Sequence, residues 1–304
     1  MLHSYSSPYN IGHKALEDFF DGKIVVQEKI DGSQISFGNH NGELFVRSRR
    51  TPIDLDDPGM FARGIDTIKS IDDILYNGYT YRGEYLAKPK HNTLSYNRVP
   101  VGHIIIYDID RGDQDYMDPE EIENETQRIN LEAVPFIGEV FQKPSVEWLD
   151  ELLTKESVLG GVKIEGVVLK NYSKFGPDKK VLMAKYVSDA FKEKHGKDWK
   201  ERNPGQNDFV NELALQYKTD ARWMKTVQHL RESGELENNP RDIPKLMREV
   251  NQDILQECEE EIKDALFKHF WKKTISRSVT HGLPEWYKGL LVSESLPHGE
   301  KGNK

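Results

Sequence analysis

One short run of residues combines a lysine with an acidic turn in a pattern that could support covalent chemistry. Residues 28–33 read Glu-Lys-Ile-Asp-Gly-Ser and follow a short β-branched stretch that predicts a strand. A lysine at the end of such a strand, followed by an acidic turn and a glycine, can be held inside a cleft. Its amine is a nucleophile only when deprotonated, and burial or neighbouring cations lower its pKa. Lys29 is therefore a candidate nucleophile, although the same pattern also fits a surface hairpin.

Further charged and aromatic residues recur in or beside predicted strands downstream of this run. These blocks are 47–50 (Arg-Ser-Arg-Arg), 82–84 (Arg-Gly-Glu), 106–108 (Ile-Tyr-Asp), 164–170 (Ile-Glu-Gly-Val-Val-Leu-Lys) and 183–185 (Met-Ala-Lys). A pocket with lysines, arginines and two separated glutamates suits a nucleoside triphosphate with a divalent metal. Cations would hold phosphate oxygens, one carboxylate would hold a ribose hydroxyl, and another would take Mg²⁺, usually through water.

Composition excludes several other classes of protein. The 304-residue chain has 42 Lys and Arg against 51 Asp and Glu, a formal net charge of −9, which argues against a histone-like or coating protein. The single cysteine excludes an internal disulfide framework and a cysteine-cluster zinc site, and fits a reducing, cytoplasmic setting. No apolar run approaches the length of about 18 residues that a membrane helix needs, and residues 1–9 lack a signal-peptide pattern, so we expect no membrane partner.

Hydrophobic patterning divides the chain into a strand-rich part and a helical part. We predict strands at 23–29, 34–37, 42–48, 80–85, 103–109, 133–141, 162–170 and 179–186, with helices at 54–76 and 145–153. Beyond a polar segment at 194–208, which we interpret as a linker, we predict helices at 209–217, 220–232, 242–273 and 283–291. The expected fold is α+β: a mainly antiparallel domain over residues 1–194, followed by a smaller all-helical domain over residues 195–304.

The six blocks, taken together and in this order, resemble the covalent nucleotidyltransferase superfamily of ATP-dependent ligases and mRNA capping enzymes. Within it the chain is most similar to the RNA ligases of the second T-even phage type. The details behind that choice are Tyr-Ser-Ser at 5–7, Arg-Thr at 50–51, the block at 165–170, and the Lys, Ser, Phe and Glu spaced along 185–193. The resemblance covers about residues 5–194 and implies an ATP-grasp-like nucleotidyltransferase domain, whereas the helical remainder matches only in character.

The resemblance implies catalytic roles for three matched positions. Lys29 would be the nucleophile that becomes adenylylated, and Glu165 would serve both the metal and the phosphate chemistry. Lys185 would act with them, and both Lys170 and Lys185 would hold phosphates.

The nucleotide would be held by residues from several other blocks. Glu84 would contact the ribose, Tyr107 would stack on adenine, and Asp108 would support the pocket. Either Arg49 or Arg50 matches the family arginine of the second block, because the doubled arginine leaves the register open. The remaining nucleotide-binding positions flank the lysine and are Glu28, Ile30, Gly32 and Ser33.

Each of these residues also has a simpler structural interpretation. Tyr107 could be an ordinary core residue, and Lys170 could be a solvated strand end. Glu84 and Glu165 could be surface carboxylates on strands. The histidines His91, His103, His195 and His281 have no zinc-ligand spacing, and we assign no role to them.

The last block departs from the family pattern. Position 183 is methionine where the family usually has a second lysine, which leaves Lys185 alone unless Lys179 or Lys180 substitutes. Met183 therefore puts triphosphate binding or one adenylylation step in question.

The function implied is ATP-dependent joining of an RNA 3′-OH to a 5′-phosphate, through lysyl-AMP and an RNA-adenylate. ATP and Mg²⁺, with Mn²⁺ as an alternative, would be needed, and the partners would be RNA ends in a nicked duplex or a broken strand. We expect a monomer in the cytoplasm, or in the host cytoplasm if a phage encodes it. The alternatives are a DNA ligase, a capping guanylyltransferase, or a non-catalytic protein that binds nucleic-acid ends. DNA ligases and capping enzymes carry a basic Arg-x-Asp-Lys block near the C-terminus, and this block is absent here.

Overall fold

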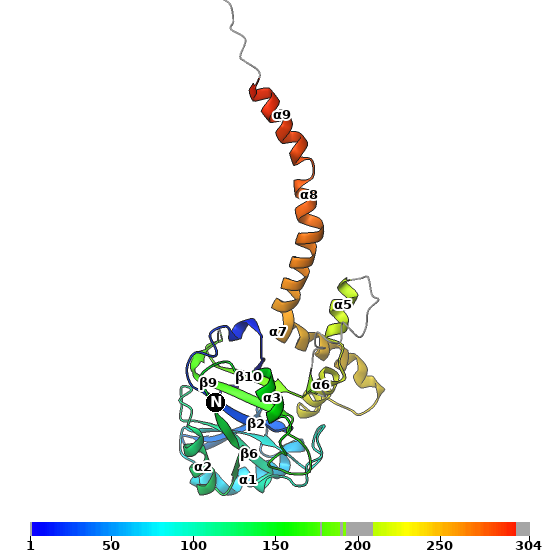
Figure 1. The fold of residues 1–304 in the computed structure, drawn as a ribbon. Helices are drawn as coiled ribbons and strands as arrows, with labels where there is room; N and C mark the ends of the chain where they lie inside the picture. Colours follow the sequence, from blue (N-terminus) through cyan, green and yellow to red (C-terminus); the bar gives the residue numbers. More distant parts are fainter. Residues whose placement is uncertain (1, 177, 189–190, 193–208, 296–304) are drawn as a thin grey trace, which may run out of the picture. The chain divides into compact units, whose positions relative to one another are not determined.

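Two compact units make up the chain, Met1–Val250 and Asn251–Lys304 (Figure 1). The computed structural model describes residues 2–176, 178–188, 191–192 and 209–295. The predicted linker at 194–208, and with it the expected boundary after residue 194, lies outside the described residues, so that boundary stays a prediction. None of the helices that the structure describes is long and apolar enough to cross a membrane.

Within the described residues, the strands of the first unit form two five-stranded sheets. The first sheet has the order β1 (Tyr9–Asn10), β10 (Val181–Val187), β9 (Gly166–Phe175), β2 (Ile24–Lys29) and β8 (Phe136–Val140). The second has the order β4 (Glu43–Ser48), β3 (Ser33–His40), β5 (Thr80–Tyr85), β6 (Ile104–Asp110) and β7 (Glu132–Ala133). Only the β1–β10 and β6–β7 pairs among them are parallel, which confirms the predicted α+β class with mainly antiparallel pairing.

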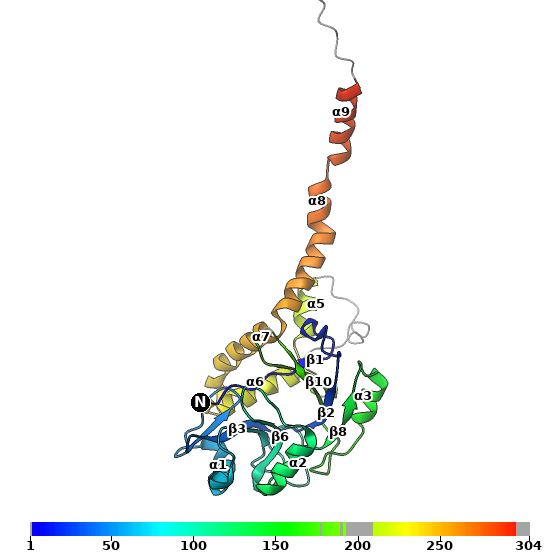
Figure 2. The same ribbon diagram turned by 90° about the vertical axis from the view of Figure 1, so that its left-hand side faces the viewer.

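The strands alternate their side chains between separate apolar clusters. Ile104 and Ile106 of β6 pack in the cluster that also holds Ile65 and Ile122, from the two helices that cover this sheet in Figures 1 and 2. Ile105, between them, points to the opposite face and packs in another cluster. The helical elements of this part are η1 (Lys14–Leu16), η2 (Gly59–Phe61), α1 (Ala62–Ile71), η3 (Asp72–Ile74), η4 (Val101–His103), α2 (Pro119–Arg128) and α3 (Val146–Leu152).

Most predicted elements are found, but one strand and two helices differ from expectation. The strand expected at 133–141 is divided between β7 in one sheet and β8 in the other, and Pro135, which has no N–H for a ladder, lies between them. The helix expected at 54–76 is shorter, because Pro58 and the left-handed Gly59 (φ 56°) delay its start.

Helix α2 is absent from the predictions although its sequence carries a clear start signal. The Asp118 side chain accepts from the Glu121 N–H at 2.9 Å, and the Glu121 side chain accepts from the Asp118 N–H at 3.0 Å. This reciprocal capping box, with Pro119 in the first turn, is a typical helix N-terminus. The helix predicted at 145–153 is found as α3, and Ser145 caps it, since its hydroxyl accepts from the Trp148 N–H.

The helical part begins, among the described residues, with α5 (Phe209–Gln216) and α6 (Asp220–Glu232). It continues with η6 (Pro240–Asp242), α7 (Ile243–Phe270), a π-helical turn (Trp271–Ile275), α8 (Ser276–Thr280) and α9 (Leu283–Ser295). Helix α6 has the predicted bounds, and Thr219 caps it by accepting from the Arg222 N–H at 3.2 Å.

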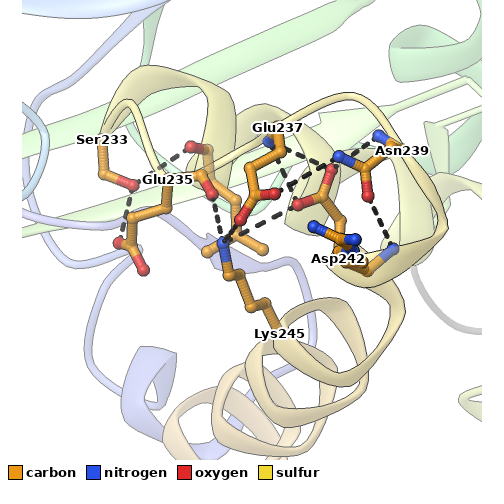
Figure 3. Close-up of polar contacts among 8 residues, drawn as sticks. Ser233, Glu235, Glu237, Asn239, Asp242 and Lys245 are labelled. Carbon is orange, nitrogen blue, oxygen red and sulfur yellow. Dashed lines mark hydrogen bonds and ion pairs between the residues drawn. The ribbon is translucent and has the colours of Figure 1, made fainter.

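The connection between α6 and α7 is fastened by polar contacts (Figure 3). Lys245 donates to the Glu235 carbonyl at 2.9 Å and to the Glu237 carboxylate at 3.1 Å. Asn239 and Asp242 form a second capping box around η6. These contacts hold the first turns of α7 in a fixed relation to α6.

Gly38 of β3 provides a test of how tightly the second sheet is packed. A methyl group there would lie 2.1 Å from the Tyr79 carbonyl oxygen, so we expect Gly38→Ala to lower the free energy of unfolding by about 2 kcal/mol. Gly289→Ala is the matched control, because no atom lies within 4 Å of the added methyl group. Urea denaturation of both variants measures the difference, and equal stabilities would contradict the packing described here.

Candidate active site

Lys29 and Glu165 lie next to each other in the first sheet, where β2 ends and β9 begins. Lys29 is the last residue of β2 and pairs with Gly166, the first residue of β9, so Glu165 comes directly before its partner strand. The Lys29 Nζ lies 2.7 Å and 2.8 Å from the two carboxylate oxygens of Glu165. The Glu165 side chain is 7% exposed, which excludes the interpretation of this residue as a surface carboxylate.

The electrostatics of this pair differ from the sequence-based expectation. Burial lowers the pKa of Lys29, but the carboxylates of Glu165, Glu84 and Asp31 outweigh it and raise the pKa above the ordinary value. A lowered pKa is therefore not found for Lys29, because its charged neighbours are carboxylates rather than cations. Burial raises the pKa of Glu165 to about 7, partly opposed by Lys29.

Glu84 is a buried carboxyl group with an unmet hydrogen-bonding requirement. Among the described residues, its Oε2 has no hydrogen-bond partner, and burial raises the pKa of the side chain to about 8. A buried polar atom without a partner is costly, and its persistence points to a ligand hydroxyl that binds there. The absence of a side chain at Gly32 keeps space open beside this oxygen, because a methyl group on Gly32 would lie 3.1 Å from it.

The residues between Lys29 and β3 are tied to a long loop after β5. The Asp31 carboxylate accepts from the backbone N–H groups of Thr93 and Leu94 at 2.8 and 2.7 Å. The Asp31 N–H in turn donates to the Tyr96 hydroxyl at 2.8 Å. Asp31 therefore anchors the turn, a role that the sequence analysis did not assign although the residue belongs to the same run.

Two further predicted nucleotide-binding residues have mainly structural contacts on the protein side. Ile30 is 3% exposed and packs in the cluster with Ile105. The buried carboxylate of Glu28 accepts from the Ser157 hydroxyl at 2.5 Å and from the Val158 N–H at 3.1 Å. Their assignment to the nucleotide stays a prediction.

Asp108, which is fully buried, is the centre of a second polar cluster. It accepts hydrogen bonds from the hydroxyl groups of Tyr5 and Tyr172 and pairs with the Lys170 amine at 3.0 Å. Lys170 also donates to the Tyr107 carbonyl at 2.9 Å, and its amine lies 5.0 Å from the centre of the Tyr107 ring. Because the Lys170 side chain is 2% exposed, it is not a solvated strand end. Its predicted contact with phosphates stays untested, and the structure shows it supporting Asp108 and Tyr107.

Arg49 and Arg50 both reach toward residues of the helical part. The Arg50 guanidinium lies 2.5 Å from the Glu249 carboxylate and 3.1 Å from His229 Nδ1. Arg49 lies 3.4 Å from His229 Nε2 and donates to the Ser7 hydroxyl at 3.1 Å. The geometry therefore engages both arginines and does not single one out.

The last predicted block lies on β10. Lys185 pairs with Val168 across β10 and β9, and its charge partly opposes the rise in the pKa of Glu165 that burial causes. Met183 is fully buried within the sheet. Lys180, one possible substitute, donates to the Ser4 hydroxyl at 2.7 Å. The family-like Glu193 lies outside the described residues.

His91 is a site residue that the sequence analysis left without a role. Its Nε2 lies 2.9 Å from the Ser33 hydroxyl, and its Nδ1 accepts from the Ala87 N–H at 3.1 Å. Burial lowers the pKa of His91 to about 4, so the ring is neutral at physiological pH. No local spacing reveals this contact, because its partner is 58 residues away in the chain.

The carboxylates present suit a metal that arrives with a nucleotide. No group of three or more His, Cys, Asp or Glu residues that could hold a metal ion occurs in the described part of the chain. Mg²⁺ often binds through one or two carboxylates together with water and substrate phosphates. Glu165, buried beside Lys29, can supply such a carboxylate.

A scan against protein-family models matches residues 22–187 to the family described as RNA ligase, a match over more than half of the chain. The chain belongs to the RNA ligase family. The matched region contains Lys29, Glu84, Glu165 and Lys185, and it begins just before β2 and ends with β10. The expected membership is thus confirmed at the level of this family.

Three solved structures of an RNA ligase from Naegleria gruberi are similar to this RNA ligase family member. A mutant with ATP and Mn has a TM-score of 0.48 and 18% identity, over 62% of this chain and 57% of that one. The protein with PPi has a TM-score of 0.46 and 17% identity, over 66% of this chain and 58% of that one. A mutant with AMP and Mn has a TM-score of 0.44 and 16% identity, over 62% of this chain and 57% of that one. The chain therefore spans a little over half the length of these proteins. No curated protein matches it.

Glu84 should make the stability of the nucleotide-free protein depend on pH. A carboxyl group with a raised pKa keeps its proton in the folded state, so its contribution to stability falls as pH rises from the ordinary value to the folded one. Glu84→Gln removes this fall and should be more stable than the wild type, by on the order of 2 kcal/mol near pH 8 and by less near pH 5. Thermal melting at both pH values checks the difference, and a pH-independent effect would contradict the burial argument.

Asp108→Asn should leave the buried Lys170 amine without a counter-charge and lower the free energy of unfolding by about 3 kcal/mol. Burial already lowers the pKa of Lys170 in the folded chain, so the unfolded chain binds more protons between that lowered pKa and the ordinary value of 10.5. The variant should therefore regain stability as pH rises toward that value. Tyr172→Phe, which keeps the ion pair, is the control and should cost about 1 kcal/mol. A variant as stable as this control would refute the assigned charge pair.

Proposed function

We propose that this chain is an ATP-dependent RNA ligase of the second T-even phage type that acts through a lysyl-AMP intermediate. The observation that carries the proposal is the Lys29–Glu165 contact beside the unsatisfied carboxyl of Glu84, on a chain of the RNA ligase family. An amine, a metal-binding carboxylate and a ribose-binding carboxylate are the groups that adenylylation requires. The order of the six sequence blocks supports the finer assignment to the phage type and to an ATP-grasp-like nucleotidyltransferase domain.

In the first step, the Lys29 amine would attack the α-phosphorus of ATP, forming an N–P bond as the bond to pyrophosphate breaks. Bound Mg²⁺, or Mn²⁺ in its place, would offset negative charge on the phosphates. A Glu165 carboxylate engaged with that metal would no longer raise the pKa of Lys29. Burial would then favour the neutral amine, which is the form that can attack.

The remaining roles follow the positions of the other predicted residues. Glu84 would hold the ribose, Tyr107 would stack on adenine over its Asp108–Lys170 support, and Lys185 would offset phosphate charge. The AMP would then pass to an RNA 5′-phosphate, and a 3′-OH would displace it to seal the ends. The helical part after residue 194 would engage the RNA, in a nicked duplex or a broken strand. The monomeric state and the cytoplasmic location stay predictions.

A non-catalytic protein that binds RNA ends is the second candidate. The feature that favours it is Met183, which is fully buried where the family usually has a lysine. The two candidates differ in whether the chain forms a covalent nucleotide adduct. A DNA ligase or a capping guanylyltransferase is separated in the same assay by the nucleotide that labels the protein and by the ends that are joined.

Lys29→Ala should abolish the transfer of label from α-labelled ATP to the protein, measured by denaturing electrophoresis after incubation with Mg²⁺. Lys29→Arg should fail equally, because a guanidinium stays protonated and cannot attack phosphorus. Lys23→Ala, a change just before the same strand at a side chain that is 49% exposed, should label at the wild-type rate. Label on the Lys29→Ala protein would exclude Lys29 as the nucleophile, and a wild type without any label would favour the non-catalytic candidate.

A further inference from the structure

Helix α6 contacts the turn that follows the nucleophilic lysine. The Gln228 amide donates a hydrogen bond to the Gly32 carbonyl at 2.8 Å and another to the Glu232 carboxylate at 2.9 Å. Asn92, in the loop after β5, donates to the same Gly32 carbonyl at 2.8 Å. This carbonyl is therefore held by two side-chain amides, one from the loop after β5 and one from α6.

The next residue of the turn, Ser33, is held by the loop after β5. His91 accepts from the Ala87 N–H through Nδ1, so its Nε2 carries the proton and donates to the Ser33 hydroxyl. The Ser33 hydroxyl also lowers the pKa of Glu232, against the larger effect of burial, which raises it. Hydrogen bonds thus tie Ser33 to the loop through His91, and Gly32 to α6 through Gln228.

Helix α6 is itself anchored in the first unit. His229, the neighbour of Gln228, is buried and lies 3.1 Å from the Glu249 carboxylate, which also pairs with Arg50. The polar connection around Lys245 fixes the start of α7 next to α6 (Figure 3). The helix is therefore held by contacts that are separate from those it makes with the turn.

Little free space surrounds the turn, so its position determines the geometry of the site. A methyl group on Gly32 would lie 2.9 Å from the Tyr85 carbonyl and 3.0 Å from the Glu84 side chain. Lys29 lies at one end of this turn and Ser33 at the other. A displacement of the turn would move the amine relative to Glu84 and Glu165, and small misplacements of reacting groups can cost large factors in rate.

We propose that Gln228 and Glu232 of α6 are positioning residues for the adenylylation of Lys29. Gln228 holds the Gly32 carbonyl and is itself held by Glu232, and these contacts fix the turn that follows the nucleophile. The adenylylation site then includes a helix that lies beyond the family match at residues 22–187. This inference rests on the proposed function, because it concerns the same transfer of AMP.

The first test is Gln228→Leu in the full chain, which removes the amide donor and keeps a side chain of similar size. Adenylylation by ATP and Mg²⁺ should slow by about tenfold, with the loss in kcat rather than in the KM for ATP. Sealing of pre-adenylylated RNA should stay at the wild-type rate, because Lys29 does not react in that step. Met224→Leu, at an exposed position on the same helix, is the matched control and should behave as the wild type.

A second test uses the two amides that share one acceptor. Asn92→Leu alone should slow adenylylation modestly, and Asn92→Leu combined with Gln228→Leu should slow it by more than the product of the two single effects. Such coupling is expected only if both amides act on the turn through the Gly32 carbonyl.

The outcomes separate this inference from the proposed function. If the wild type takes no label from ATP, the proposed function fails. If the wild type is labelled and Gln228→Leu labels at the same rate or faster, α6 does not position the lysine and the inference is overturned. An equal loss in adenylylation and in the sealing of pre-adenylylated RNA would also overturn it, because that result indicates general damage to the fold.

Discussion

The contact between Lys29 and Glu165 is the interaction around which the rest of the structure is arranged. Glu165 is the buried partner, with its side chain 7% exposed against 27% for Lys29, and a buried charge is costly when its partner is removed. The register of β2 and β9 brings the two residues together, since Lys29 pairs with the residue that follows Glu165. The turn after Lys29 then leaves this sheet and enters β3 of the second sheet, so the pair lies where the two sheets are joined.

Two polar clusters in the first unit differ in how completely their groups are satisfied. Asp108 is surrounded by donors and pairs with Lys170, so this cluster is a structural support. Glu84, in contrast, has a buried oxygen without a partner among the described residues, and carboxylates crowd around Lys29. An unpartnered buried oxygen and neighbouring like charges are both unfavourable, so the groups around Glu84 are less completely satisfied than those around Asp108.

Helix α6 belongs to the helical part of the sequence but packs with the strand-rich part. By sequence, the strands end near residue 187, and every element described from residue 209 onward is a helix. By contact, Gln228 and His229 belong with the residues around the lysine, and the compact unit extends to Val250. Composition and periodicity report the type of an element, whereas membership in a packed unit depends on which surfaces meet.

The sequence by itself determined the local features of this protein. Alternating and β-branched stretches predicted most strands, because short-range patterns lie in consecutive positions. The lysine–aspartate–glycine run and the blocks that follow it made Lys29, Glu84 and Glu165 candidate site residues through their resemblance to a family. Only the tertiary structure decided the partners of these groups: the pairing of Lys170 with Asp108, the division of one apolar run between two sheets, and the contact of α6 with the turn. The last of these joins residues 196 positions apart, and no local spacing encodes such a contact. It depends on how the two sheets and the helix pack.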